Sequence, residues 1–242
     1  MRKLHVLMKK EELDGQRLDG KVVIVLDILF ATTTIVAALS EGASEVWPAL
    51  DGDAARALAQ QQGDHPHLLA GELYAETLSG FAPATPLAVL ARLPAQGRLI
   101  YATTNGTVAL TRSQGAAQVY AAALLNAQAV VDHVARHHPD DTILVVCSGS
   151  ADRFNLEDFY GAGYLVSLFR QAGVRDLTDA ARAAEWMHAA TDARACFNAA
   201  RVGQRMLDKG LPEELDYAAR KSVCSVVPQL VGGVLRPVTT AC

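Results

Sequence analysis

The sequence predicts an α/β protein with a three-layer α/β/α architecture, a mostly parallel sheet and a β-hairpin near the carboxyl end. Three observations support this prediction. Short apolar runs rich in Val and Ile alternate with longer segments of helical periodicity, the order expected of parallel strands joined by helices. The runs are continuous and short, which is typical of buried strands. Two apolar runs near the carboxyl end flank Gly232-Gly233, a dipeptide that suits a hairpin turn.

The elements follow in order along the chain. The first strand is predicted at Lys21–Leu26, and a helix follows over Thr32–Ser40, with Gly42 as its stop. Further strands are predicted at Val46–Leu50, Arg98–Ala102, Gln118–Leu124 and Thr142–Cys147. Further helices are predicted at Asp53–Gln62, Ala127–His137, Leu156–Gln171, Asp179–Ala190 and Ala193–Lys209. The hairpin falls within Val223–Val238, and Gly71–Pro86 is predicted as a long loop of the kind that is often functional.

A weak internal repeat relates two parts of the chain. Ala31-Thr32-Thr33 and the segment after it are echoed by Ala102-Thr103-Thr104 and its following segment, each as strand, Thr-rich turn, helix and strand. The echo indicates either an internal duplication or a chance likeness between Ala-rich helices. The chain is predicted to form one α/β domain over residues 1–242, with two similar lobes of about 1–95 and 96–242 as the alternative.

Composition excludes several classes of partner. The net charge is −4 and no basic stripe is present, so no nucleic-acid partner is expected. No apolar stretch approaches the length of a membrane span, and the amino terminus lacks a signal-peptide core, so no membrane association is expected. The four scattered cysteines fit reduced thiols, and the predicted location is the cytoplasm.

Polar turns follow three of the predicted strands, where ligands bind in open α/β sheets. Hydroxyls and free backbone N–H groups at a helix start can cradle an anion such as phosphate, although Ser and Thr also simply cap helices. Three such turns in one sheet favour a shared phosphate site. The candidate substrate-binding residues are Thr32, Thr33, Thr34, Thr103, Thr104, Asn105, Gly106, Thr107, Ser148, Gly149 and Arg153.

Acidic residues near the same strand ends supply a second signal. Asp27 closes an apolar strand, where a carboxylate is costly unless it is paired or bound to a metal. Glu72 follows an apolar run, and Glu157 and Asp158 open a predicted helix. Carboxylate oxygens are the ligands that Mg²⁺ prefers. Two or three of these carboxylates could hold Mg²⁺, and the alternative is that they only interact with helix dipoles or lie at the surface. We predict Mg²⁺ as the cofactor. The candidate ligands are Asp27, Glu72, Glu157 and Asp158, and the first three are also the candidate catalytic residues.

A competing signal is the spacing of Cys147 and Arg153. In cysteine-dependent phosphatases a thiolate attacks phosphorus, while loop N–H groups and an arginine hold the phosphate oxygens. The helix that follows Cys147 could lower the pKa of the thiol. The alternative interpretation is that Cys147 is a small core residue at the end of a strand.

Taken in order, these segments resemble the 2-phosphosulfolactate phosphatase family. The resemblance rests on Val25 to Thr34, Gly71-Glu72, Thr103 to Thr107 and Cys147 to Asp158, and it covers roughly residues 20–235. It implies a three-layer α/β/α fold and a Mg²⁺-dependent phosphatase that forms sulfolactate for coenzyme M synthesis. It also implies a small phosphorylated acid as substrate and is compatible with a homodimer.

The chain departs from the family pattern at several positions. Phe30 and Leu73 stand where the pattern has arginines, and Ala84-Thr85-Pro86 replaces Asn-Ser-Pro. Arginine is the usual bidentate ligand of phosphate and sulfonate groups. The departures favour a second hypothesis, a diverged or non-catalytic binder of an anionic metabolite. A third hypothesis is the cysteine-dependent phosphatase that uses Cys147.

Overall fold

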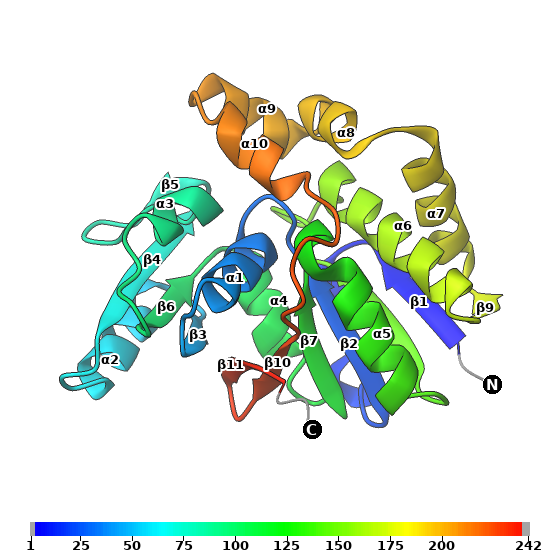
Figure 1. The fold of residues 1–242 in the computed structure, drawn as a ribbon, viewed down its shortest axis with the longest axis horizontal. Coiled ribbons are helices and arrows are strands. Elements are labelled where there is room, and N and C mark those ends of the chain that lie inside the picture. Colours follow the sequence, from blue (N-terminus) through cyan, green and yellow to red (C-terminus); the bar gives the residue numbers. More distant parts are fainter. Residues whose placement is uncertain (1–2, 239–242) are drawn as a thin grey trace.

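A computed structural model describes residues 3–238 and contains one eleven-stranded sheet with helices on both faces (Figure 1). The strands are β1 (Lys3–Leu7), β2 (Lys21–Leu26), β3 (Glu45–Ala49), β4 (His67–Leu73), β5 (Glu76–Thr77), β6 (Arg98–Ala102), β7 (Gln118–Ala122), β8 (Thr142–Cys147), β9 (Asp176–Leu177), β10 (Pro228–Val231) and β11 (Val234–Pro237). The helices are α1 (Ala31–Ser40), α2 (Gly52–Gln61), α3 (Pro86–Leu90), α4 (Gly106–Arg112), α5 (Ala127–His137), α6 (Leu156–Gln171), α7 (Asp179–Ala190), α8 (Ala193–Ala199), α9 (Arg201–Asp208) and α10 (Pro212–Ala218). The predicted mixed α/β class, with its mostly parallel sheet, is confirmed.

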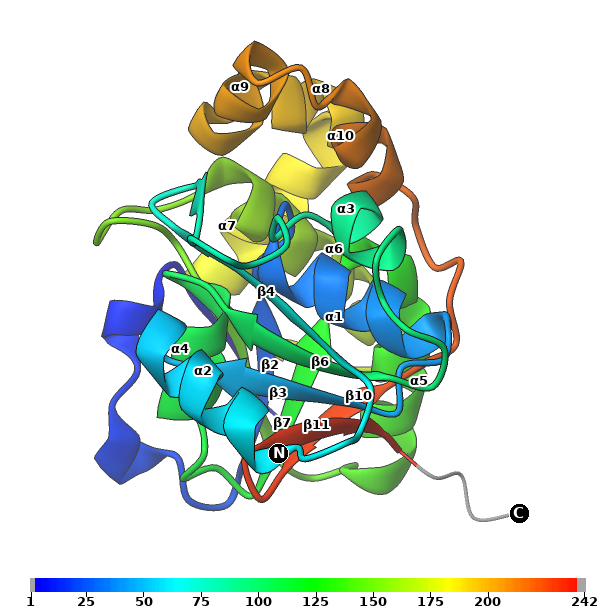
Figure 2. The same ribbon diagram turned by 90° about the vertical axis from the view of Figure 1, so that its left-hand side faces the viewer.

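The sheet consists of two parallel blocks joined by a hairpin. Strands β4, β6 and β3 form one parallel block, and β7, β2, β8, β1 and β9 form the other. Between them, β11 pairs with β3 and β10 pairs with β7, both antiparallel. The predicted hairpin is confirmed, and Gly232 and Gly233 both have positive φ, as its tight turn requires. The twisted sheet leaves β3 and β6 lying across the direction of β2 (Figure 2).

The central strands are buried on both faces because their sequences are continuously apolar. In β2, Val22, Ile24 and Leu26 face the cluster that contains residues of α5, α6 and α7. Val23 and Val25 face the opposite cluster, which contains residues of α1 and α4. The alternation along one strand therefore places helices on both faces of the sheet.

The two copies of the repeat exchange strands. The first copy is β2–α1–β3 and the second is β6–α4–β7, but β2 pairs with β7, and β3 pairs with β6. This reciprocal pairing is the arrangement that a two-fold relation between the copies would produce. The sheet thus combines strands from both sides of residue 95.

Two predicted segments differ in the structure. The single helix predicted over Ala193–Lys209 is wrong, because Ala200 is extended (ψ 141°) and separates α8 from α9. The sharp corner is closed by Gly203, where a Cβ would lie 1.8 Å from the Phe197 carbonyl oxygen. The loop predicted over Gly71–Pro86 is wrong at its start, because the end of β4 pairs with the short strand β5.

Candidate active site

Asp27 directly follows β2, at the point where the two copies of the repeat meet. Its carboxylate accepts hydrogen bonds from the backbone N–H groups of Ala31 and Gly106, the first residues of α1 and α4. The contact is close, since a Cβ on Gly106 would lie 2.3 Å from the Ala31 Cβ and 2.6 Å from Asp27 Oδ2. Only glycine at position 106 lets both helices approach this carboxylate.

The threonines of the two turns are engaged with the backbone. Thr32 Oγ1 donates to the Asp27 carbonyl oxygen (3.1 Å) and accepts from the Asp27 N–H (2.9 Å). Thr107 Oγ1 makes the same pair of bonds with Thr103, at 2.9 and 3.1 Å. The two turns are therefore built alike, and their buried hydroxyls shape the backbone around the site.

Thr33 and Thr34 follow the same rule. Their hydroxyls donate to the carbonyl oxygens of Ile28 (2.5 Å) and Phe30 (2.7 Å), and both side chains are buried. Their role as direct substrate ligands stays a prediction. The contacts that the structure provides are those of residues that hold the turn after β2.

Glu72, on β4, is held against the turn after β6. Its carboxylate accepts hydrogen bonds from the Thr104 N–H (2.6 Å), the Thr104 hydroxyl (3.1 Å) and the Ala75 N–H (2.6 Å). Three donors fix the orientation of this carboxylate. Glu72, Thr104, Asn105 and Asp27 line a single pocket, so the structure brings these predicted residues together.

The start of α6 contributes two acids with different surroundings. Asp158 accepts hydrogen bonds from the N–H groups of Ile28 (2.9 Å) and Gly149 (3.1 Å), and thereby ties the segment after β2 to the segment after β8. Gly149 has a positive φ of 63°, and a Cβ there would lie 2.6 Å from the Arg153 carbonyl oxygen. Glu157, 2% exposed, lines the pocket with Asp27, whereas Asp158 does not.

The buried acids have unusual proton affinities. Burial, followed by the charge of Glu72, raises the pKa of Asp27 to about 7. Burial, together with the charge of Asp27, raises the pKa of Glu157 to about 7. Burial and the charges of Asp27 and Glu157 raise the pKa of Asp158 well above its usual range. A pocket that concentrates negative charge in this way favours a bound cation.

The Glu157→Gln substitution is expected to stabilise the metal-free protein at pH 8 by roughly 3 kcal/mol. The folded state holds the Glu157 proton up to about pH 7, whereas the free side chain has a pKa of 4.5. Stability contributed by this proton is therefore lost as pH rises between these values. Urea unfolding in EDTA at pH 4.5 and pH 8 measures the effect, which should vanish at pH 4.5.

The matched control for this substitution is Glu213→Gln, which neutralises an exposed glutamate on α10. It should change the free energy of unfolding by less than about 0.5 kcal/mol at either pH. Equal effects of the two substitutions at pH 8 would show that Glu157 is not destabilised by its surroundings.

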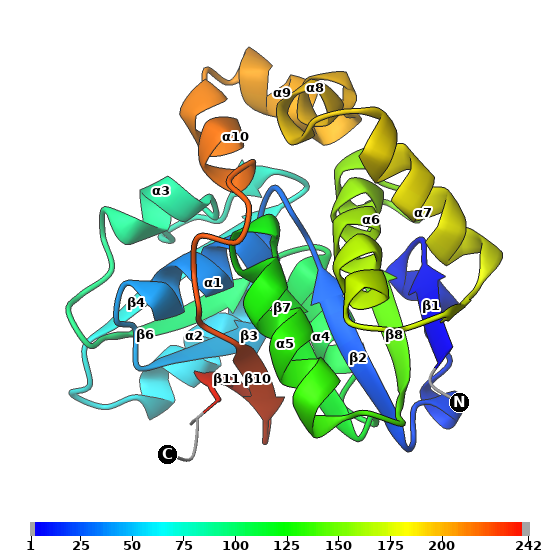
Figure 3. The same ribbon diagram turned by 45° about the vertical axis from the view of Figure 1, so that its right-hand side comes forward.

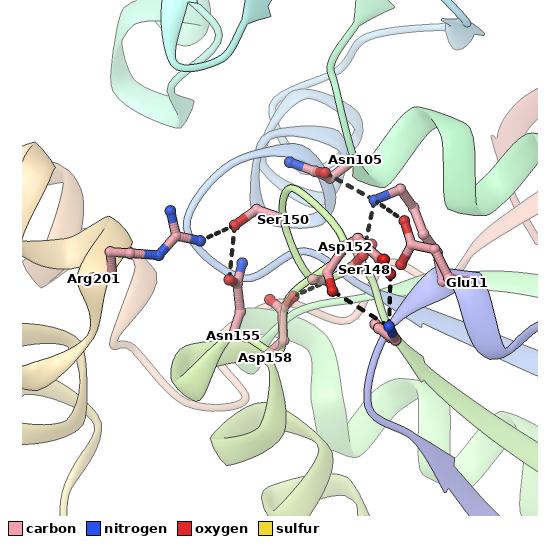
Figure 4. A network of polar contacts seen from close by, with 11 residues as sticks. Glu11, Asn105, Ser148, Ser150, Asp152, Asn155, Asp158 and Arg201 are labelled. Carbon is pink, nitrogen blue, oxygen red and sulfur yellow. Dashed lines mark hydrogen bonds and ion pairs between the residues drawn. The ribbon is translucent and has the colours of Figure 1, made fainter.

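Basic residues approach the pocket from two sides. Arg201 and Arg205, on α9, line it together with Phe30. The Arg201 guanidinium donates to the Ser150 hydroxyl, which in turn donates to Asn155 Oδ1 at 2.9 Å (Figure 4). The charge of Arg201 also acts on Glu157, where it opposes the rise in pKa.

From the other side, Lys10 Nζ donates to Asn105 Oδ1 at 2.9 Å and to the Ser148 carbonyl oxygen at 3.4 Å (Figure 4). The Ser148 hydroxyl is buried and has no hydrogen-bond partner in the described part of the chain. Arg153 is exposed and does not line the pocket, so its role in binding stays a prediction.

Cys147 lies at the end of β8 and is fully buried. Burial, with the charge of Asp158 next in size, raises the pKa of the thiol well above its usual range. A thiol in these surroundings holds its proton, whereas a nucleophilic cysteine needs a lowered pKa. The geometry therefore favours the interpretation of Cys147 as a core residue.

A metal ion in the pocket would need oxygen ligands, which the acidic residues offer. Among residues 3–238, no group of three or more His, Cys, Asp or Glu side chains forms a ready-made metal site. Mg²⁺ rarely uses such a cage; it commonly takes one or two carboxylates, several waters and the oxygens of a substrate phosphate. Asp27 and Glu157 meet that smaller requirement, since both line the pocket and burial disfavours their negative charges.

Several pocket residues were not among the predicted site residues. Arg205, Tyr74 and Val202 line the pocket but belong to no motif, and Asn155 lies within the Cys147 to Asp158 segment without having been singled out. Lys10 lies in the amino-terminal segment, which the sequence marks only by charge. The departures at Phe30 and Leu73 separate in space, because Phe30 lines the pocket and Leu73 is half exposed outside it.

An acidic pocket at the strand ends of a mostly parallel sheet is typical of the active sites of α/β enzymes. The family model for 2-phosphosulpholactate phosphatase matches residues 7–233. The chain belongs to the 2-phosphosulfolactate phosphatase family.

No helix within residues 3–238 has both the length and the apolar character needed to cross a bilayer.

Three curated relatives illustrate the match, each named a probable 2-phosphosulfolactate phosphatase. The protein of Deinococcus radiodurans is 36% identical over 215 residues, covering 88% of each chain. That of Symbiobacterium thermophilum is 33% identical over 226 residues, covering 90% of this chain and 95% of its own. That of Carboxydothermus hydrogenoformans is 30% identical over 227 residues, covering 94% and 92%.

Proposed function

We propose that the protein is a Mg²⁺-dependent phosphatase that hydrolyses a small phosphorylated 2-hydroxy acid, such as 2-phosphosulfolactate, to the hydroxy acid and phosphate. The observation that carries the proposal is one pocket lined by three carboxylates, Asp27, Glu72 and Glu157, and two arginines, Arg201 and Arg205. Carboxylates suit a divalent cation, and guanidinium groups suit a phosphate or carboxylate.

In this proposal the three acidic residues have different roles, because their surroundings differ. Asp27 and Glu157 supply oxygen ligands for the cation, which neutralises charge on the phosphoryl oxygens when bound. Glu72 keeps its three hydrogen bonds to residues 75 and 104 and holds the turn after β6 beside Asp27. Without the cation the pKa of Asp27 is raised to about 7, and the charge of a bound cation would lower it and keep the carboxylate ionised.

Two arginines of α9 supply positive charge to a pocket that lacks the family arginines at positions 30 and 73. Arg201 and Arg205 bring two guanidinium groups to the pocket from α9, at positions that no phosphate motif marks. They place positive charge where a phosphorylated acid needs it. This observation favours a catalytic member of the family over a non-catalytic binder.

Phosphate release from 2-phosphosulfolactate and 2-phospholactate, measured with Mg²⁺ and with EDTA, tests the proposal. Release with Mg²⁺ is expected to exceed release in EDTA by roughly a hundredfold or more, since metal neutralisation contributes several kcal/mol to phosphoryl transfer. Restoring Mg²⁺ after EDTA should restore the rate. No release from folded protein across both substrates would reject the proposal and favour the binder.

A further inference from the structure

The catalytic pocket borders a second cavity, which is lined by residues of α3, α9 and α10. Figure 3 shows these three helices near one end of the molecule. Five residues line both: Phe30, Glu72, Ala75, Val202 and Arg205. Counting the space at its mouth, the second cavity takes in about 1110 Å³, against about 600 Å³ for the catalytic pocket. The site is therefore roomier beyond Phe30 than around Asp27.

The wall of the second cavity is largely apolar. Its apolar residues come from the turn after β2, the α3 segment and the α9–α10 corner: Phe30, Pro83, Ala84, Ala88, Met206 and Leu211. Apolar surface of this kind gains free energy by contact with an apolar group and gains nothing from a small, fully charged one. Its composition thus matches an organic group rather than a second phosphate.

The charged residues of the wall are already paired, with one exception. Glu214 accepts hydrogen bonds from the N–H groups of Leu87 (2.9 Å) and Ala88 (3.3 Å) at the start of α3. Glu76 pairs with Lys209 at 2.7 Å. The Arg205 side chain makes no hydrogen bond or ion pair with any residue of the described chain, 3–238, and it lines both cavities. Its guanidinium is free to bind a carboxylate where the cavities meet.

We propose that the second cavity binds the organic group of the substrate, and that the preferred substrates are phosphate esters of 2-hydroxy acids with an apolar side chain, aryl or branched alkyl. The inference rests on the proposed function for the phosphate end of the substrate. The ester phosphate lies beside Asp27 and Arg201, the carboxylate binds Arg205, and the side chain passes Phe30 into the second cavity.

Two probes test the inference, the 2-phosphate esters of 3-phenyllactate and of lactate. They share the phosphate and the carboxylate and differ only in the phenyl group. The wild type is expected to prefer the phenyl ester by roughly tenfold or more in kcat/KM, the discrimination typical of an apolar pocket. Ala88→Trp on α3 and Thr77→Trp on β5 each fill the cavity from a different element and should bring the ratio of the two kcat/KM values near one.

Ala91→Trp is the matched control, because Ala91 is exposed at the end of α3 and lines neither cavity. It should keep the wild-type ratio. Thermal melting shows whether each variant is folded, and two cavity-filling positions guard against the failure of one. A ratio near one in the wild type, or a ratio unchanged in folded Ala88→Trp and Thr77→Trp, would overturn the inference.

Calorimetric binding of both esters separates this inference from the proposed function. Tighter binding of the phenyl ester by the wild type, lost in Ala88→Trp, supports the second cavity even if no phosphate is released. Release of phosphate from phospholactate without any advantage for the phenyl ester would overturn the inference and leave the phosphatase standing.

Discussion

Phosphate release is expected to fall roughly a thousandfold or more in the Asp27→Asn variant, as in other enzymes that lose a central charged group. The carboxylate of Asp27 lies at the floor of the pocket and receives N–H bonds from the starts of both α1 and α4. Asparagine would keep the size of the side chain but lose its charge, and its amide NH₂ would face one of the N–H donors. The variant should therefore lose cation binding.

Saturating Mg²⁺ and substrate isolate the effect of Asp27→Asn on kcat. Thermal melting of the same sample shows whether the protein is folded. Asp152→Asn is the control, because the Asp152 side chain is 72% exposed, pairs with Lys9 and lies outside the pocket. This control should keep its rate within about twofold. An Asp27→Asn rate within tenfold of the wild type would remove Asp27 from the proposed mechanism.

The Gly106→Ala substitution is expected to destabilise the protein by roughly 1–3 kcal/mol, the usual cost of overpacking, and to abolish most activity. The added methyl group would lie 2.3 Å from the Ala31 Cβ and 2.6 Å from Asp27 Oδ2, so that α1 and α4 must move apart. Moving either helix shifts an N–H donor of Asp27. Chemical denaturation and Mg²⁺-dependent phosphate release measure the two effects.

Gly115→Ala provides the comparison for Gly106→Ala. A Cβ at Gly115 would lie at an ordinary 3.7 Å from its nearest neighbour, the Gly15 carbonyl oxygen. This variant should change stability by less than about 1 kcal/mol and leave phosphate release near the wild-type rate. Similar behaviour of the two alanine variants would mean that the contact between α1 and α4 tolerates a methyl group.

Much of the fold follows from local sequence, because β2 and β8 are continuous apolar runs that no other element suits. The strand Lys3–Leu7 was missed because only Leu4 and Val6 are buried, among charged neighbours. The break between α8 and α9 was missed because Ala200 is a good helix former, and the extended conformation there arises from tertiary packing around Gly203.

Some residues of the site could be predicted from the sequence and others could not. Asp27, Glu72 and Glu157 could be predicted to meet because each lies near the end of a strand or the start of a helix at one edge of the sheet. Arg205 could not, because its place depends on how α9 packs over that edge. Nor does sequence show whether a threonine hydroxyl binds a ligand or a backbone carbonyl.

The internal repeat shows most clearly what sequence matching alone cannot establish. The repeated Ala-Thr-Thr string aligns Thr32 with Thr103. In the structure, Thr32 bonds to Asp27 in the way that Thr107 bonds to Thr103, so Thr32 is equivalent to Thr107 and Asp27 is equivalent to Thr103. The turn after β2 is one residue longer than the turn after β6, so a match of Ala-Thr-Thr strings lands one helical turn away. The Ala-Thr-Thr strings therefore identify the two related turns but align their residues in the wrong register.

The exchange of strands between the two copies also sets an order of events during synthesis on the ribosome. When β2 has emerged, neither of its neighbours in the sheet exists yet, since β7 and β8 come about a hundred residues or more later. Asp27 meets its donor Gly106 only after β6, and the tie from Asp158 to Ile28 forms only after β8. Nascent chains that end before α6 therefore carry an unfinished pocket, and long-range pairings of this kind make folding slow.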